Sequence, residues 1–135
     1  MKAKEGCLTE VYNMVKEFHK TFNHPCPDVV TPMTKERKKA RAAWIQEEVN
    51  EFLLSDSITE DVDALVDCLY FVIGSLVEEN VDPSYVFELV QKANMSKIFP
   101  DGKPHYNSQN KVIKPEGWVA PDEEIHKYIE SLQNP

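Results

Sequence analysis

Residues 64–77, with the sequence ALVDCLYFVIGSLV, form the longest apolar run of the chain, and one carboxylate, Asp67, interrupts it. The run lies in a segment whose pattern predicts a helix from Ile58 to about Glu79, opened by the capping-box pair Ser57 and Glu60. A helix that is apolar nearly all round lies at the centre of a bundle or at a subunit interface. The run is shorter than the roughly 20 apolar residues of a membrane span. It therefore predicts a buried helix and no membrane anchor.

Helical patterns also occur on both sides of this segment. The predicted helices run from about Thr9 to Phe22, from the N-cap Thr34 to about Leu54, from Ile58 to about Glu79, from Asp82 and Pro83 onward, and from Pro121 onward. In the helix after Thr34 the predicted buried face comprises Ala42, Ile45, Val49, Phe52 and Leu53. Residues 24–33 are too rich in proline for a helix, and 105–107 can pair with 111–114 as a short hairpin.

These elements predict an all-α fold, a four- to five-helix bundle with a short irregular or hairpin tail before the last helix. One domain is expected over residues 1–135, with its core at about 8–97 and the tail at 98–135. Because four or five helices barely cover so apolar a central helix, we expect a homodimer or a higher homo-oligomer.

The net charge of −8 argues against binding to a nucleic-acid polymer, which requires clustered Lys and Arg. Three cysteines without a CxxC spacing predict neither a disulfide framework nor a four-thiolate zinc site. The first residues lack the apolar region of a signal peptide, so a cytoplasmic location is expected.

Two acidic clusters are the first candidates for chemistry. Glu47, Glu48 and Glu51 lie on one flank of the helix that precedes the apolar segment, where an uncompensated cluster is repulsive. Asp63 and Asp67 share a face of the apolar helix. The plainer interpretations are a solvated acidic face for the glutamates and, for Asp67, a salt bridge to Arg37 or Arg41.

Antiparallel packing of these two helices would bring the acidic flanks face to face. Oxygen ligands without His or Cys favour Mg2+, with Mn2+ as the alternative, and leave positions for water and phosphate oxygens. Positive charge gathers later in the chain, in a set of candidate substrate-binding residues comprising Lys92, Asn94, Lys97, Lys111 and Lys114. For any single lysine, favourable charge at a helix C-terminus is the simpler explanation.

The order of these motifs resembles the all-α NTP pyrophosphatase superfamily, which includes MazG-like enzymes, dimeric dUTPases and phosphoribosyl-ATP pyrophosphohydrolases. The resemblance covers about Thr34 to Trp118 and rests on Glu-Glu-x-x-Glu at 47–51, the acid pair at 63 and 67, and Asn-Met-Ser-Lys at 94–97. It implies hydrolysis of a nucleoside triphosphate to the monophosphate and pyrophosphate.

The resemblance also implies roles for individual residues. Glu48, Glu51 and Asp67 match metal ligands, and Glu47, the first acid of the motif, is the expected catalytic residue. Many members carry an acid three residues before the aspartate, where this chain has Ala64, so Asp63 is the expected substitute. The expected activity is the Mg2+-dependent hydrolysis of dUTP or another non-standard nucleotide, which would clear that nucleotide from the cell.

Three other interpretations compete with this one. A di-iron bundle needs two Glu-x-x-His motifs, and the chain has one, from Glu123 to His126. A zinc site at His19, His24 and Cys26 has only loose spacing. A non-catalytic module that binds nucleotides or proteins would use Arg37 or Arg41 to neutralise Asp67.

Overall fold

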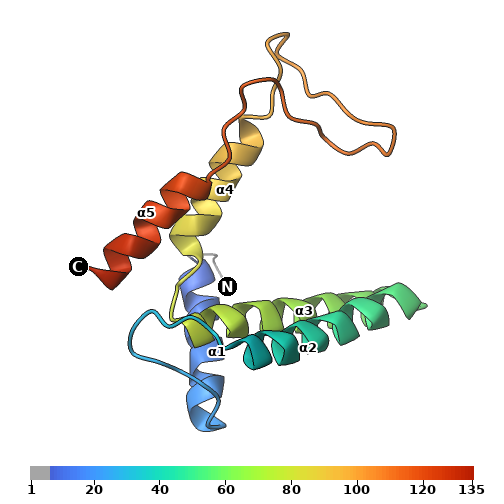
Figure 1. The fold of residues 1–135 in the computed structure, drawn as a ribbon. Helices are drawn as coiled ribbons and strands as arrows, with labels where there is room; N and C mark the ends of the chain where they lie inside the picture. Colours follow the sequence, from blue (N-terminus) through green and yellow to red (C-terminus); the bar gives the residue numbers. More distant parts are fainter. Residues whose placement is uncertain (1–6) are drawn as a thin grey trace. The chain divides into compact units, whose positions relative to one another are not determined.

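The computed structural model describes residues 7–135, which form five α-helices and no β-strand (Figure 1). The helices are α1 (Cys7–Thr21), α2 (Lys35–Leu54), α3 (Ile58–Glu79), α4 (Ser84–Met95) and α5 (Asp122–Gln133). The all-α prediction is confirmed. The chain forms two compact units, Met1–Pro83 with α1 to α3 and Ser84–Pro135 with α4 and α5. Within the described residues, no helix has the length and apolar character needed to cross a membrane.

Local capping signals set the helix boundaries. The Thr34 side chain accepts a hydrogen bond from the Arg37 N–H at 3.2 Å, as an N-cap does. Ser57 accepts a hydrogen bond from the Glu60 N–H at 3.1 Å and donates its hydroxyl to the Glu60 carboxylate, so the predicted N-cap of α3 is confirmed. The helix α4 begins at Ser84, one residue later than the predicted start at Pro83.

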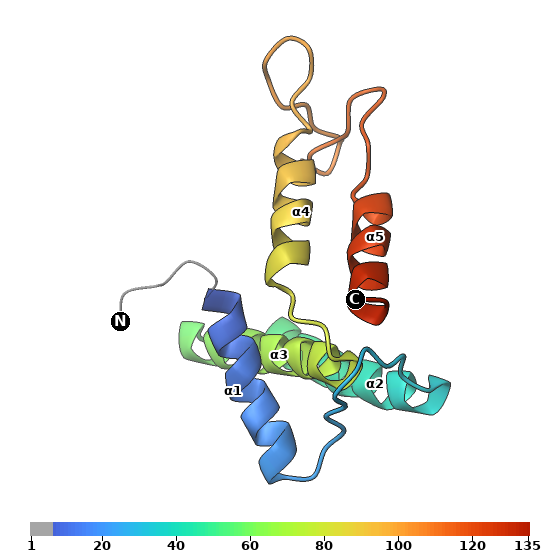
Figure 2. The ribbon, with the colours of Figure 1, turned by 90° about the vertical axis from the view of Figure 1, so that its left-hand side faces the viewer.

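The first unit is organised around α3. Helices α2 and α3 run side by side in opposite directions, and α1 packs against α3 (Figures 1 and 2). A hydrogen bond from Ser55 to Asp61 joins the two sides of the short α2–α3 connection. The buried core between α1 and α3 consists of Tyr12, Val15, Ile73 and Val77.

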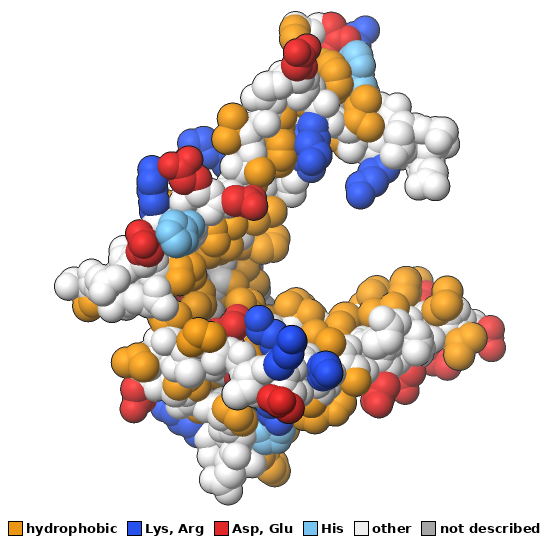
Figure 3. Space-filling view, in the orientation of Figure 1, with side chains coloured by type: hydrophobic (Ala, Val, Ile, Leu, Met, Phe, Trp, Pro, Cys, Tyr) orange, Lys and Arg blue, Asp and Glu red, His pale blue; other side chains and the backbone are white. Residues whose placement is uncertain are grey.

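The predicted buried face of α2 is wrong for the single chain. Phe52 and Leu53 are 41% and 78% exposed, whereas Arg41 is the buried residue of this helix. Arg41 is buried because the facing end of α3 is polar, with Ser75 and Glu78 as its partners. The apolar side chains of α2 and α3 therefore remain open along this pair, where Figure 3 shows them gathered on one edge.

The second unit pairs α4 with α5 (Figure 2), and the Tyr85 and Tyr128 rings lie 4.7 Å apart between them. The connection between these helices contains the expected hairpin in a minimal form, the antiparallel bridge between Tyr106 and Val112. Hydrogen bonds of 2.9 Å from Asn107 N to Lys111 O and from Ile113 N to His105 O flank the bridge. The tail is thus ordered without forming a sheet.

Candidate metal centre

Four acids from α2 and α3 form an acidic cluster in the first unit. The adjoining Glu51 carboxyl, burial, and the charges of Glu51, Asp67 and Asp63 together raise the pKa of Glu48 to about 7. Such a shift means that the carboxylates lie close enough to repel one another. The carboxyls of Glu48, Glu51, Asp63 and Asp67 therefore lie close enough to influence the ionisation of one another.

Asp67 has no cationic partner in this cluster. Burial raises the pKa of its carboxyl, and the charges of Asp63 and Glu51 raise it further. Among residues 7–135, no Lys or Arg forms an ion pair with Asp67. The alternative of a structural salt bridge is wrong, because Arg37 and Arg41 bind Glu78 instead.

A cavity of about 350 Å³ opens beside the cluster, between the end of α2 and the start of α3. Glu51 and Asp63 both line it, from opposite helices. Ala64 forms part of its wall and is 3% exposed. The neighbouring Asp63, which is exposed, supplies an acidic side chain to the same wall.

The donor set fits a hard divalent cation. One oxygen of Glu48, Oε2, is buried without any hydrogen-bond partner, and a buried orphaned oxygen costs free energy that a cation would recover. Carboxylate oxygens alone are the ligand type of Mg2+ and Mn2+. No three of these four carboxylates lie within 4.8 Å of one another. Glu47 is exposed on α2.

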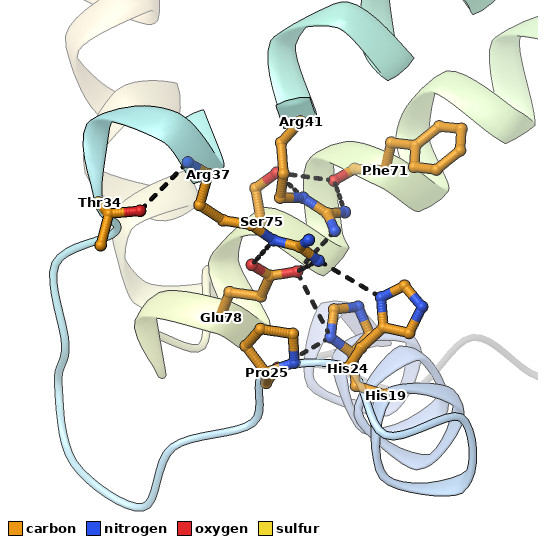
Figure 4. A network of polar contacts seen from close by, with 9 residues as sticks. All are labelled: His19, His24, Pro25, Thr34, Arg37, Arg41, Phe71, Ser75 and Glu78. Carbon is orange, nitrogen blue, oxygen red and sulfur yellow. Dashed lines mark hydrogen bonds and ion pairs between the residues drawn. The ribbon is translucent and has the colours of Figure 1, made fainter. Parts of the chain in front are cut away.

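A second polar cluster, centred on Glu78, was missed by the sequence analysis. Arg37 donates to both Glu78 oxygens at 2.8 and 2.9 Å, and Arg41 donates to Oε2 at 2.7 Å (Figure 4). Arg41 also donates to Ser75 Oγ and to the Phe71 carbonyl. His19 from α1 lies behind Glu78, with Nδ1 3.8 Å from Oε2. The network joins all three helices of the first unit.

This second cluster is an ion-pair network and not a metal site. His19, His24 and Glu78 present ligand atoms within 4.8 Å of one another, but guanidinium groups already occupy both Glu78 oxygens. His19 Nδ1 is hydrogen bonded to the Pro25 carbonyl at 3.0 Å. Gly74 makes room for the network, since a Cβ there would lie 2.9 Å from His19 Nε2 and closer still to Arg41.

Comparison with known proteins identifies the family. The family model for phosphoribosyl-ATP pyrophosphohydrolase matches residues 15–94, which include both helices of the acidic cluster. The chain belongs to the phosphoribosyl-ATP pyrophosphohydrolase family. It is also similar to a crystal structure from Exiguobacterium sp. 255-15, assigned provisionally as an NTP pyrophosphohydrolase, at 33% identity over 90% of this chain and 94% of that one, with a TM-score of 0.49. No curated protein sequence matches the chain.

Membership of the phosphoribosyl-ATP pyrophosphohydrolase family confirms the resemblance to all-α NTP pyrophosphatases and supports hydrolysis of a phosphoric anhydride. Of the candidate substrate-binding residues, Lys92 and Asn94 lie within the matched region, exposed on α4. Lys97, Lys111 and Lys114 follow it in the tail. The structure brings Lys97 and Lys114 to one aromatic ring, that of Trp118. All five belong to the second unit, and their role in binding substrate stays a prediction.

The buried histidine of this pyrophosphohydrolase family member predicts acid sensitivity. Burial lowers the pKa of His19 below 6.5, so the folded protein keeps this imidazole neutral. As the pH falls below about 6.5, the unfolded chain binds a proton that folded His19 does not, and the free energy of unfolding decreases. For Glu78, burial opposes ionisation, but the Arg37 hydrogen bond and the charges of Arg41 and Arg37 outweigh it and lower its pKa. Protonation of Glu78 therefore lowers the free energy of unfolding a second time, below pH 4.5.

Urea unfolding at a series of pH values from 8 to 5 measures this effect. The variant His19→Gln keeps an N–H that can donate to the Pro25 carbonyl but has no titrating group in this range. Relative to its own value at pH 7, the wild type should lose more stability at pH 5 than this variant, because the opposite contribution of the raised Glu48 pKa is the same in both proteins. Parallel pH profiles for the two proteins would contradict the assignment.

Proposed function

We propose that the protein is a Mg2+-dependent nucleoside triphosphate pyrophosphohydrolase that acts on dUTP or another non-standard nucleotide. The observation that carries the proposal is the acidic cluster of α2 and α3. It has no cationic partner among the described residues, and it contains a buried, unpaired oxygen of Glu48. Structural ion pairs in this unit are made elsewhere, at Glu78, so the cluster is not needed to hold the helices together.

The chain's own residues take distinct parts in the proposed reaction. Glu48, Glu51 and Asp67, with Asp63 in place of the acid missing at Ala64, would hold Mg2+ or Mn2+. The bound ion would neutralise phosphate charge and acidify a water molecule. Glu47 is the proposed acceptor of the proton that this water loses as it attacks phosphorus. Attack of the water on the α-phosphorus would break the bond between the α-phosphorus and the bridging oxygen to the β-phosphate, so that pyrophosphate leaves and the nucleoside monophosphate remains.

The proposed substrate depends on how many cationic side chains are free to bind its phosphate groups. Phosphoribosyl-ATP, the substrate in the family's name, carries a second phosphate arm that needs further cationic partners. In the first unit, the two arginines nearest to the acids along α2 are engaged by Glu78. We therefore favour a nucleotide with a single polyphosphate chain.

A nucleotide panel incubated with and without Mg2+ tests the proposal. The panel contains dUTP, the four standard dNTPs, modified triphosphates and phosphoribosyl-ATP, and the assay separates phosphate from pyrophosphate. We expect Mg2+-dependent release of pyrophosphate, fastest with a non-standard pyrimidine nucleotide. Orthophosphate as the only product would indicate another phosphatase chemistry. Binding without turnover of any nucleotide would favour the non-catalytic module.

We also propose that the protein is a homodimer through the open apolar faces of α2 and α3. Val62, Leu65, Val66 and Leu69 of α3 are each between 49% and 55% exposed. Phe52 and Leu53 of α2 are exposed as well, and large apolar side chains gathered on one helix pair are typical of an interaction surface. A second copy of the same helix pair offers a matching apolar surface.

Light scattering at micromolar concentration should then give the mass of a dimer for the wild type. Leu69→Glu places a charge in the proposed interface and should shift the mass toward that of the monomer. Met14→Glu changes an equally apolar and 66% exposed residue of α1, so it serves as the control and should stay dimeric. A monomeric wild type, or equal masses for both variants, would contradict this interface.

A further inference from the structure

The indole of Trp118 ties the tail of the chain to the end of α4. Its N–H donates to the Ala93 carbonyl at 2.8 Å and to Ser96 Oγ at 2.9 Å. The same carbonyl also accepts hydrogen bonds from the Ser96 N–H and the Ser96 hydroxyl, so the indole joins a set of contacts that closes the last turn of α4. These bonds hold the ring in one orientation beside the segment that follows α4.

Two lysines from separate segments lie against this fixed ring. Lys97 Nζ and Lys114 Nζ are both 5.2 Å from the centroid of the Trp118 ring, within the range of a cation–π interaction. Lys97 directly follows the end of α4, and Lys114 follows the hairpin. Neither ammonium forms an ion pair with a carboxylate among the described residues.

An exposed lysine is normally mobile, and ordering it costs conformational entropy when a ligand binds. Contact with an indole reduces that cost, because the side chain is already held near one position. Two ammonium groups at one ring also concentrate positive charge in an acidic protein. The arrangement therefore favours a ligand with several negative oxygens.

We propose that Trp118 is a positioning residue that holds Lys97 and Lys114 as a clamp for the polyphosphate group of the substrate. The identity of the anion as substrate rests on the proposed function, whereas the clamp itself requires only a polyphosphate. All three residues lie outside the region 15–94 that matches the family model.

The first test measures the binding of inorganic pyrophosphate by calorimetry, at low ionic strength and in EDTA, so that the acidic cluster carries no divalent ion. We expect Lys97→Ala, Lys114→Ala and Trp118→Leu each to weaken binding by about 10-fold. Lys97→Arg keeps both the charge and the contact with the ring, and should restore binding. Lys127→Ala removes an exposed lysine of α5 that pairs with Glu123, and should have no effect.

A mutant cycle separates positioning from a merely structural role. If Trp118 acts through the lysines, Trp118→Leu should cause no further loss of pyrophosphate binding in a Lys97→Ala/Lys114→Ala background. Should Trp118→Leu fail to fold, Trp118→Phe, which keeps a ring face and loses the N–H, replaces it in the cycle. An equal additional loss in that background, or wild-type affinity for Lys97→Ala and Lys114→Ala, would overturn the proposal.

Steady-state kinetics connect the clamp to catalysis. With an active wild type, Trp118→Leu should raise KM by about 10-fold and change kcat little, since it removes binding rather than the reacting groups. One outcome is that the protein binds pyrophosphate through the clamp and yet hydrolyses no nucleotide. That result would refute the proposed function and would still support the clamp. Hydrolysis whose KM is insensitive to Lys97, Lys114 and Trp118 would refute the clamp alone.

Discussion

Asp67→Asn is expected to lower kcat/KM for nucleotide hydrolysis by at least about 100-fold and to leave the fold as stable as the wild type or more stable. The loss of activity follows from its proposed role as a metal ligand beside Glu48 and Glu51. The gain in stability has an electrostatic cause. Burial and the charges of Asp63 and Glu51 raise the pKa of Asp67, so its ionised form destabilises the folded state at neutral pH.

Three measurements on the same variant check this result: hydrolysis, denaturant unfolding and calorimetric titration with Mn2+. The matched control is Asp56→Asn, which removes an exposed carboxylate from the α2–α3 connection and should change none of the three. A loss of about 3–5 kcal/mol in unfolding free energy would instead mean that Asp67 is a structural ion-pair residue. No Mn2+ binding by the wild type, with or without nucleotide, would refute the metal site itself.

The helices could be predicted from the sequence because each helix boundary depends on residues that are only a few positions apart. Thr34 and the pair Ser57–Glu60 cap the helices that they were expected to cap, because such hydrogen bonds span only three residues. The bridge at Tyr106 and Val112 was equally local, with a turn between its partners. The coarse position of the acidic cluster followed in turn from two acidic patterns on neighbouring helices.

To predict the buried network around Glu78, one must know how α2 and α3 are aligned along each other. No local sequence pattern gives that alignment. Ser55 meets Asp61 across the connection, and continuing both helices from there places Arg41 opposite Ser75 and Arg37 near Glu78. The same register brings Glu48 level with Asp67. An antiparallel alignment of the two helical segments from their short connection would therefore have assigned both arginines to Glu78, and left Asp67 without a partner.

The error in the α2 face has a different physical cause. Hydrophobic periodicity shows which side of a helix avoids water, but not whether the same chain or another copy covers it. Val49, Phe52 and Leu53 follow the helical pattern, yet the three helices of the first unit leave them open. The residue that is buried, Arg41, is one that hydropathy places outside, because its burial depends on a specific carboxylate far along the chain.

Glu78→Gln is expected to lower the free energy of unfolding by about 3–5 kcal/mol, the largest effect on stability that we predict. Glu78 is 3% exposed and accepts hydrogen bonds from both Arg37 and Arg41. A glutamine keeps one acceptor and removes the negative charge. The Arg41 side chain, only 4% exposed, is then left as a buried cation without a counter-charge. Arg37, at 28%, can regain water and contributes less.

Urea unfolding of the purified protein measures the loss, and Glu79→Gln supplies the control. Glu79 is the next residue on α3, forms no ion pair among the described residues, and should change stability by less than about 0.5 kcal/mol when its charge is removed. The double variant Glu78→Leu/Arg41→Met removes both charges together, so it should be more stable than Glu78→Gln alone. If the double variant is less stable than the single one, the cost arises from lost packing around Gly74 and His19 and not from the unpaired arginine.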